Sequence, residues 1–221
     1  MSLMMFETQA LRARNLIRRR QAGRLRQKAC NTPFSRDTKA RLLLITQNER
    51  IPQSQAYAFH HYANDLMRLY GAEVREADLE DILAGRPIAA KDATAVAFQT
   101  AYDVSDDVLR QLFVRLHADH PEALIGALDW SAPTDLRNAA RMDEKVDFYI
   151  KKHVLRDRSQ YGRATLGDTN LTDYFARRLR LSDPERLYPV TSGFLEKLIV
   201  GPSPGAGFSV PTILAASARQ N

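Results

Sequence analysis

A dense run of charged, amide and hydroxyl side chains follows a short apolar segment in the second half of the chain. It contains Lys152, His153, Arg156 and Arg158. An imidazole exchanges a proton near neutral pH, and guanidinium groups bind phosphate or carboxylate oxygens in a bidentate manner. A solvated helix face would spread such groups at helical spacing. Their position directly after an apolar segment instead predicts a ligand-contacting loop, which defines a site more clearly than it defines a reaction.

Five short apolar segments alternate with helical patterns along the chain, which is typical of right-handed crossover units in a parallel sheet. The second segment is more polar than the others, so we expect it to be more exposed. The sequence therefore predicts an α/β fold: a Rossmann-like open parallel sheet of about five strands, with helices on both faces. The predicted strands are residues 41–46, 72–77, 93–98, 123–128 and 146–150.

Apolar residues recur at helical spacing between these segments. The predicted helices are residues 54–70, 79–83, a helix beginning at Ser105, one opened by residues 133–135, and one near 171–181. Proline and glycine are frequent over residues 188–211, and the last 30 residues either cover the sheet edge or form a linker. The expected organisation is a basic arm and linker over 1–38, a Rossmann-like domain over 39–205, and a tail or linker over 206–221.

The carboxyl ends of parallel strands are where ligands of such sheets bind, and they nominate six candidate residues. His153 is the candidate catalytic base. Five further residues are candidates for ligand binding: Asn48 after the first strand, Asp129 after the fourth, and Lys152, Arg156 and Arg158 after the fifth.

Purely structural roles are the alternative for several polar residues of this region. Asp157 is expected to hold Arg156 and Arg158 in place by ion pairing. Residues 167–170 have the composition of a tight turn and a helix cap, with Asp168 or Asn170 as the capping side chain.

The motifs for nucleotides and metals are missing or weak. The loop at residues 47–54 contains no glycine, so the dinucleotide fingerprint is absent where the fold requires it. His117 and His120 have a spacing that suits a metal, but no third ligand accompanies them. Cys30 is the only cysteine, which excludes a disulfide within the chain and a thiolate cluster. We therefore expect no metal and no cofactor.

The net charge of +6 is unevenly distributed. Residues 1–30 carry eight basic side chains and one acidic side chain, a net charge of +7, so the rest of the chain sums to −1. A helix in this arm would lie on anionic lipid, dock on an acidic partner or another part of the protein, or contact nucleic acid, and nucleic acid is the least favoured of these. A poorly ordered basic tail is the remaining alternative. We expect a cytoplasmic protein that is peripheral to the inner membrane.

Three strings of the sequence resemble the N-terminal half of bacterial two-domain glycosyltransferases, which consist of facing Rossmann-like halves and are often encoded with surface-polysaccharide genes. They are residues 129–137, 146–158 and 167–174, and the resemblance covers about residues 41–205. It implies an acceptor-binding half that would be an enzyme only when paired with a donor-sugar-binding domain. A second set of alternating strands and helices is absent before Asn221, so the resemblance implies that the donor half is not in this chain.

These observations favour a glycosyltransferase-like domain in cell-surface glycan synthesis, acting on a sugar or lipid-linked acceptor. Sugar transfer needs a base near the acceptor hydroxyl, for which His153 is placed, and cations near the departing phosphate, for which Arg156 and Arg158 are placed. The alternatives are a non-catalytic α/β module that binds an anionic ligand or a protein, and a nucleic-acid-binding protein that uses the arginine-rich arm. A partner domain or a second copy of the chain is compatible with the first two.

Overall fold

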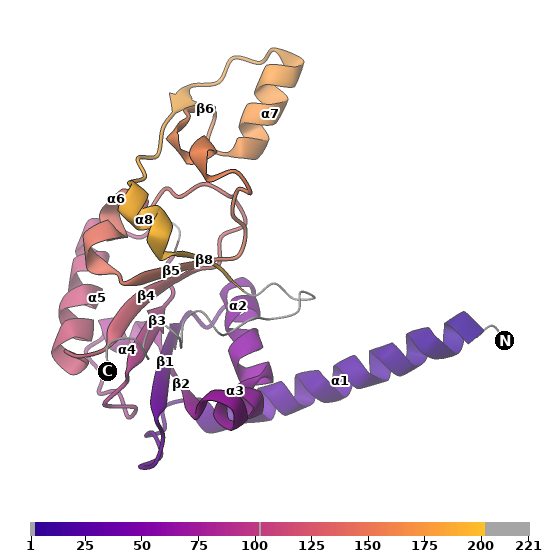
Figure 1. The fold of residues 1–221 in the computed structure, drawn as a ribbon, viewed down its shortest axis with the longest axis vertical. Coiled ribbons are helices and arrows are strands. Elements are labelled where there is room, and N and C mark those ends of the chain that lie inside the picture. Colours follow the sequence, from indigo (N-terminus) through magenta and orange to yellow (C-terminus); the bar gives the residue numbers. More distant parts are fainter. Residues whose placement is uncertain (1–2, 102, 202–221) are drawn as a thin grey trace.

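A computed structural model describes residues 3–101 and 103–201, and its centre is one parallel β-sheet (Figure 1). The strand order is β2-β1-β3-β4-β5-β8, and every neighbouring pair is parallel. The strands are β1 (Ala40–Thr46), β2 (Ala72–Asp78), β3 (Ala95–Phe98), β4 (Leu124–Asp129), β5 (Phe148–Lys151) and β8 (Leu198–Val200). The predicted α/β class and parallel sheet are confirmed, with six strands in place of about five.

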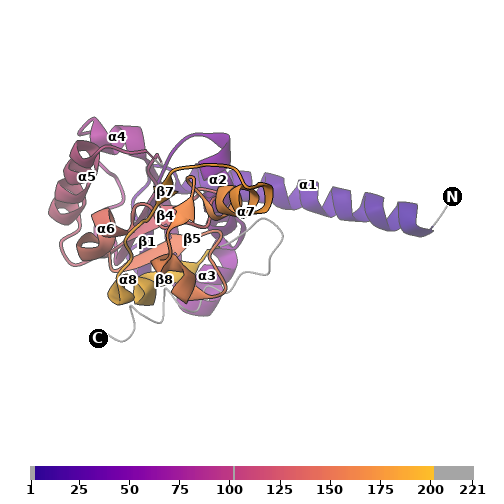
Figure 2. The same ribbon diagram turned by 90° about the horizontal axis from the view of Figure 1, so that it is seen from above.

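Eight α-helices and two short 3-10 helices surround the sheet in the described part of the chain (Figures 1 and 2). The α-helices are α1 (Leu3–Ala29), α2 (Arg50–His61), α3 (Ala63–Tyr70), α4 (Leu79–Leu83), α5 (Asp106–Asp119), α6 (Ala139–Met142), α7 (Asn170–Leu179) and α8 (Ser192–Lys197). The 3-10 helices are η1 (Asp143–Lys145) and η2 (Arg158–Gly162), and the short strands β6 (Thr165–Leu166) and β7 (Glu185–Arg186) form a separate antiparallel pair beside α7.

Alternation along the strands builds an apolar layer on each face of the sheet. On β1, Leu43 and Ile45 face the layer formed with α4, α5, α6 and α8, whereas Leu42 and Leu44 face the layer formed with α2 and α3. Both faces are therefore buried, which explains why this strand reads as a continuous apolar run.

Gly126 in β4 permits a close approach that any other residue would prevent. A Cβ atom at this position would lie 2.1 Å from the ring of Phe148 on the neighbouring β5. The aromatic ring thus lies directly over the β4 backbone and fills the layer beneath α2.

Four elements differ from the sequence prediction. The helix predicted to open at residues 133–135 is absent there, and only the short α6, Ala139–Met142, follows. The helix predicted over 54–70 is two helices that meet at Tyr62, and it begins earlier because Pro52 fits a first helical turn. Residues 198–200 pair with β5 as a sixth strand, so the segment near the C-terminus covers the sheet edge, whereas the tail predicted over 206–221 lies outside the described residues. The β2 strand is mostly buried, not exposed, because the end of α1 and the segment after it pack along that edge.

The basic arm is a long helix, α1, which continues through Gly23. It projects away from the sheet in both views (Figures 1 and 2). Only its last turns contact the body, where Ala22 and Ala29 are buried. None of the described helices combines the length and the apolar character needed to cross a bilayer.

Candidate ligand-binding site

The crevice between β1 and β3, where the strand order reverses, is filled by the protein's own side chains. In open parallel sheets this switch point is the usual place for a ligand. Here the indole Nε1 of Trp130 donates to Gln47 Oε1 and to the Thr100 carbonyl, at 2.9 Å in both cases. The cavity that Trp130 lines between the ends of β3 and β4 is only about 10 Å³. Access is therefore shifted away from the switch point, toward the end of β4.

Buried amide side chains hold the strand ends and α2 in one unit. Gln99 is fully buried; its Nε2 donates to the Pro52 carbonyl at 2.9 Å, and its Oε1 accepts the Gln47 amide at 3.2 Å. Gln55, also fully buried, donates to the Asp129 carbonyl at 3.1 Å. These two glutamines were not predicted from the sequence, because a buried and an exposed glutamine cannot be distinguished within a polar segment.

Asp129 lies at the end of β4, and neighbouring groups take up its carboxylate. Its Oδ2 accepts from the Tyr149 hydroxyl and from Lys151 Nζ, each at 2.7 Å, and its Oδ1 accepts from the amide and hydroxyl of Ser131. Burial, and next the Asp129 carboxylate, raise the pKa of Tyr149 well above its ordinary value, so the hydroxyl remains a donor. These contacts position the loop after β4, and the predicted ligand-binding role of Asp129 stays a prediction.

An open pocket of about 310 Å³ lies over this loop, and we call it the β4 pocket. One wall is the loop itself and the opposite wall is the turn before α7. The Thr134 hydroxyl donates to Asn170 Oδ1 at 2.8 Å, which ties the two walls together. The lining residues are Trp130, Ser131, Ala132, Pro133, Arg137, Asp168 and Thr169.

Arg137 places a fixed positive charge at the β4 pocket. Its Nε and Nη2 donate to the two carboxylate oxygens of Asp135 at 2.7 and 2.9 Å, and Nη2 also reaches the Asp168 carbonyl at 3.1 Å. The guanidinium carbon lies 5.2 Å from the centre of the Tyr188 ring. The hydrogen bonds to Asp135 raise the pKa of Arg137 further, so its charge is permanent.

The predicted catalytic residue, His153, is exposed and joined to the wall of the β4 pocket. Its Nδ1 lies 3.1 Å from the Ala132 carbonyl oxygen. A carbonyl only accepts, so Nδ1 carries the hydrogen and the lone pair of the neutral ring lies on Nε2. That tautomer leaves Nε2 able to accept a proton. Lys152, half-buried, is tied to the same strand end, since its amide lies 3.4 Å from the Asp129 carbonyl oxygen.

The other three candidates, Arg156, Arg158 and Asn48, do not line the β4 pocket. Arg156 is exposed and Arg158 is half-buried at the start of η2. Asn48 is exposed in the loop after β1, and it does not line the β4 pocket. The structure thus brings His153, Lys152 and Asp129 to the loop after β4, but not Asn48.

Two predicted structural roles are wrong. Asp157 forms no ion pair with Arg156 or Arg158 in the described residues; it caps η2 by accepting from the amide and hydroxyl of Ser159, which lower its pKa. The cap of α7 is Thr169, whose side chain accepts from the Thr172 amide. The Thr169 amide in turn donates to Thr172 Oγ1, and this pair of hydrogen bonds completes the cap.

A second polar cluster, the Glu76 cluster, lies at the carboxyl ends of β1 and β2. The Glu76 carboxylate is 2% exposed. It accepts from Arg26 at 2.9 to 3.1 Å, from Thr46 Oγ1 at 2.6 Å, from Gln53 Nε2 at 3.2 Å and from His60 Nε2 at 2.5 Å. Burial acts to raise the pKa of Glu76, but the hydrogen bonds from His60 and Arg26 outweigh it and lower the pKa to about 2.

No cluster of three or more His, Cys, Asp or Glu side chains suited to a metal occurs in the parts of the chain that the structure describes. His117 is exposed and His120 is buried, so the two do not share an environment. No protein-family model matches the chain, and a search of curated proteins also finds no match.

Proposed function

We propose that this domain is the acceptor-binding half of a glycosyltransferase in cell-surface glycan synthesis, and that a separate domain or chain supplies the donor-sugar site. The observation that carries the proposal is the β4 pocket, which opens at the carboxyl edge of a parallel sheet and has His153 joined to its wall. This combines a binding space with a group that can remove a proton.

The lining of the β4 pocket suits a sugar acceptor. The face of an aromatic ring such as Trp130 packs against the C–H groups of a sugar ring, while a pocket of this size binds hydroxyls through a few polar groups. The volume of about 310 Å³ is at the lower end for small-molecule sites, which fits one or two sugar rings. Arg137 adds a charge that favours an acidic sugar or a phosphate at the rim.

In the proposed reaction, His153 Nε2 takes the proton of the acceptor hydroxyl. The hydroxyl oxygen at the same time bonds to the anomeric carbon of the donor sugar. The bond between that carbon and the phosphate oxygen breaks, and the electron pair leaves with the nucleotide. Arg156 and Arg158 would stabilise the negative charge on the leaving phosphate. Asp129 and Lys151 would act by positioning, because they hold the loop on which the pocket is built.

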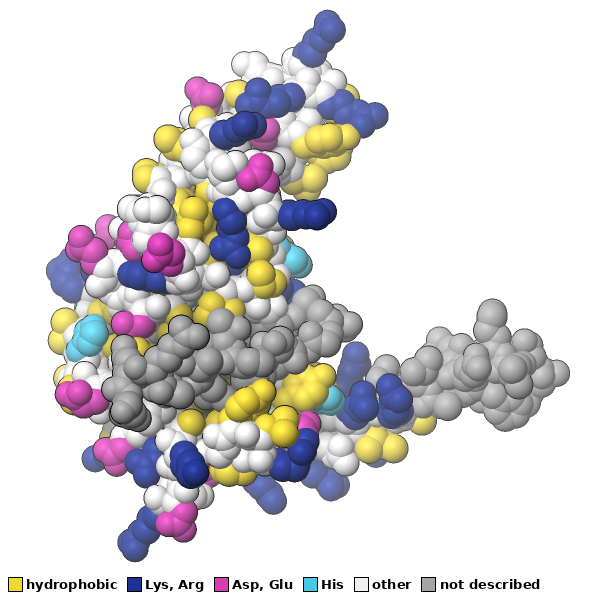
Figure 3. Space-filling model, viewed as in Figure 1, with side chains coloured by type: hydrophobic (Ala, Val, Ile, Leu, Met, Phe, Trp, Pro, Cys, Tyr) yellow, Lys and Arg dark blue, Asp and Glu magenta, His cyan; other side chains and the backbone are white. Residues whose placement is uncertain are grey.

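The arm supports a location at the cytoplasmic face of the inner membrane. Arg14, Arg19 and Arg20 are exposed on α1, and so are Leu16 and Ile17, at 52% and 57%. Figure 3 shows Lys and Arg side chains gathered where α1 leaves the body. Cations beside exposed aliphatic side chains are what a helix on an anionic lipid surface requires. A lipid-linked acceptor would then be available beside the domain.

The test is acceptor binding by the full chain. A polyprenyl-phosphate-linked sugar in detergent micelles is titrated against the wild type and against His153→Ala and Arg137→Ala, with His117→Ala as the control for losing an exposed histidine. We expect Arg137→Ala to weaken binding about tenfold, the value of a lost charge-assisted hydrogen bond, and the control to leave it unchanged. His153→Ala should weaken binding less and abolish transfer once a donor-binding domain is added. Unchanged binding in both pocket variants would refute the proposal.

A further inference from the structure

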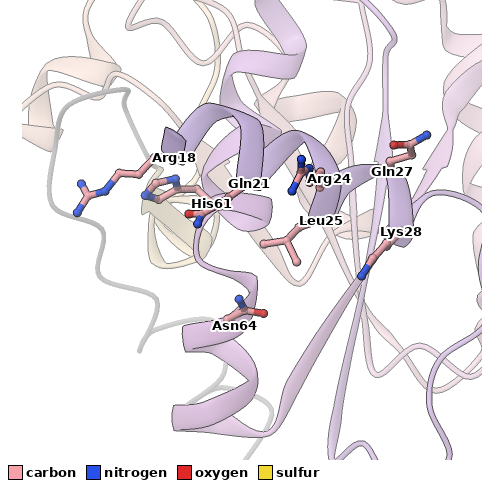
Figure 4. A pocket seen from close by; sticks show the side chains of 8 residues that line it. All are labelled: Arg18, Gln21, Arg24, Leu25, Gln27, Lys28, His61 and Asn64. Atoms are coloured by element: carbon pink, nitrogen blue, oxygen red, sulfur yellow. The ribbon is translucent and has the colours of Figure 1, made fainter. Parts of the chain in front are cut away.

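A notch of about 440 Å³ lies where the C-terminal half of α1 meets the junction of α2 and α3 (Figure 4). Its two walls come from distant parts of the sequence, α1 on one side and the end of α2 with the start of α3 on the other. The lining side chains include Arg18, Gln21, Arg24, Lys28, His61 and Asn64.

The notch is built by helix geometry. Arg18, Gln21 and Lys28 repeat at three- and seven-residue intervals, which places them along one side of α1. Ala22 and Ala29 on the adjacent stripe are 2% and 4% exposed, because α1 rests against the body there. The contact fixes the helix, so Arg18 and Lys28 stand at the two ends of the notch.

The cations of the notch have no anionic partner among the residues that the structure describes. Arg18, Arg24 and Lys28 form no ion pair and no side-chain hydrogen bond among the described residues, and no carboxylate lines the notch. The one carboxylate of α3, Asp65, is engaged by Arg68 at 3.1 Å. Arg26 of the same helix differs, because Glu76 binds it fully.

Neutral side chains complete the notch: Gln21 lies on α1 beside the cations, and His61 and Asn64 lie on the opposite wall. Burial, and next the charge of Arg18, lower the pKa of His61, so its imidazole is neutral at physiological pH. The amide groups of Gln21 and Asn64 provide further donors (Figure 4). Three cations facing neutral donors, with no carboxylate, are the composition that binds a phosphate.

We propose that this notch binds a phosphomonoester, with Arg18, Arg24 and Lys28 contacting the phosphate oxygens and Asn64 donating from the opposite wall. The volume matches that of sites for small molecules, and a dianionic phosphate offers enough oxygens for all three cations. The phosphate has two sources, a soluble phosphate ester or a lipid with a terminal phosphate. The site lies on different elements from the β4 pocket and does not depend on the function proposed for it.

The first experiment titrates the full chain with glycerol 3-phosphate, and with phosphatidylcholine vesicles that contain either phosphatidic acid or phosphatidylserine at equal surface charge. The notch variant Arg18→Gln/Lys28→Gln is compared with Arg19→Gln/Arg20→Gln, which removes the same charge from the same helix outside the notch. We expect the notch variant to weaken phosphomonoester binding at least about tenfold, and the control less than about twofold. Saturable binding of glycerol 3-phosphate indicates the soluble source, and selective binding of phosphatidic acid vesicles indicates the lipid source.

A second variant separates a built site from a merely charged helix. Asn64→Leu removes a donor from the opposite wall without changing the charge, and we expect it to weaken phosphomonoester binding several-fold. Equal losses of phosphomonoester binding in the two double variants would overturn the proposal. Equal affinity for both vesicle types, together with no saturable binding of glycerol 3-phosphate, would overturn it too. Tight binding of duplex DNA that both pairs weaken equally would do so too, and would favour nucleic acid as the ligand of α1. His153→Ala should leave phosphomonoester binding unchanged, which keeps this outcome separate from that of the β4 pocket.

Discussion

The Glu76 cluster and the β4 pocket lie at the same edge of the sheet, but the protein satisfies their charges differently. In the Glu76 cluster, four side chains donate to one buried carboxylate, so its oxygens are taken up within the protein. In the β4 pocket, Asp129 at the base is satisfied by Tyr149, Lys151 and Ser131, and Arg137 in the wall pairs with Asp135. His153, which is joined to the wall of the pocket, retains a lone pair on Nε2, and Arg156 in the loop after β5 is exposed.

The difference shows how scaffold and function are separated in one sheet. A buried charge with all its hydrogen bonds made stabilises the native geometry, and its removal leaves unpaired partners. A charge at an open rim contributes little to stability, but it remains available to a ligand. Variants of the two regions should therefore affect different measurements.

The largest expected effect is on the Glu76 cluster. Glu76→Gln removes the charge that Arg26 and His60 share, and we expect the free energy of unfolding to fall by about 3–5 kcal/mol. Chemical denaturation measures it, with Glu80→Gln, an exposed residue of α4, as the control. If the free energy of unfolding falls no more than in the control, the Glu76 cluster contributes no more to stability than an exposed ion pair does.

Acid should reveal the same cluster in the wild type. The folded pKa of Glu76, about 2, lies below the ordinary value of 4.5, so the ionised form favours the native state. This contribution, about 3 kcal/mol by linkage, is complete above pH 4.5 and is lost as the pH falls toward 2. Denaturation midpoints measured across this range should fall more steeply for the wild type than for Glu76→Gln. Parallel curves for the two proteins would contradict the assignment.

A smaller effect is expected at the base of the β4 pocket. Tyr149→Phe removes one hydrogen bond to Asp129 but keeps the ring that packs on Phe194. We expect a loss of about 1 kcal/mol in the free energy of unfolding, while Tyr70→Phe, at an exposed position of α3, should have no effect. No loss at Tyr149 would mean that Lys151 and Ser131 satisfy the carboxylate without the tyrosine hydroxyl.

The smallest effect on stability is expected at the rim. Arg156→Ala and Arg158→Ala should each change the free energy of unfolding by less than about 0.5 kcal/mol. Transfer, measured with a donor-binding domain present, should nevertheless fall about tenfold or more, because each arginine is proposed to stabilise the leaving phosphate. A clear loss of stability in either variant would show that the arginine has a structural role, which would contradict its proposed role in transfer.

The strands were predictable because they are buried on both faces and read as apolar runs. The third run, for example, is buried at every position from Ala95 to Phe98. The strand at 198–200 was missed because three apolar residues after a helix define no strand until β5 offers a partner. The break at Tyr62 was missed because the apolar pattern continues through it.

The site was only partly predictable, for a similar reason. The polar residues after each strand could be found, since the end of a strand is a local feature. Their partners could not, because the contacts of Trp130 with Gln47 and of Arg26 with Glu76 join residues far apart in the sequence. One signal was available in the sequence: Glu76 shares a face of its strand with Ala72 and Val74, and a carboxylate on a buried face requires partners.

The α1 helix is anchored at one end only, by Arg26 on Glu76 and by the packing of Ala22 and Ala29. A helix of 27 residues is about 40 Å long, so its far end reaches well beyond the sheet. An anchored helix of this kind acts as a lever arm of fixed length. A surface that binds the N-terminal end of α1 would therefore fix the distance and the angle between that surface and the carboxyl edge of the sheet. Shortening α1 by whole turns would therefore change the reach of the domain without altering a single contact in its core.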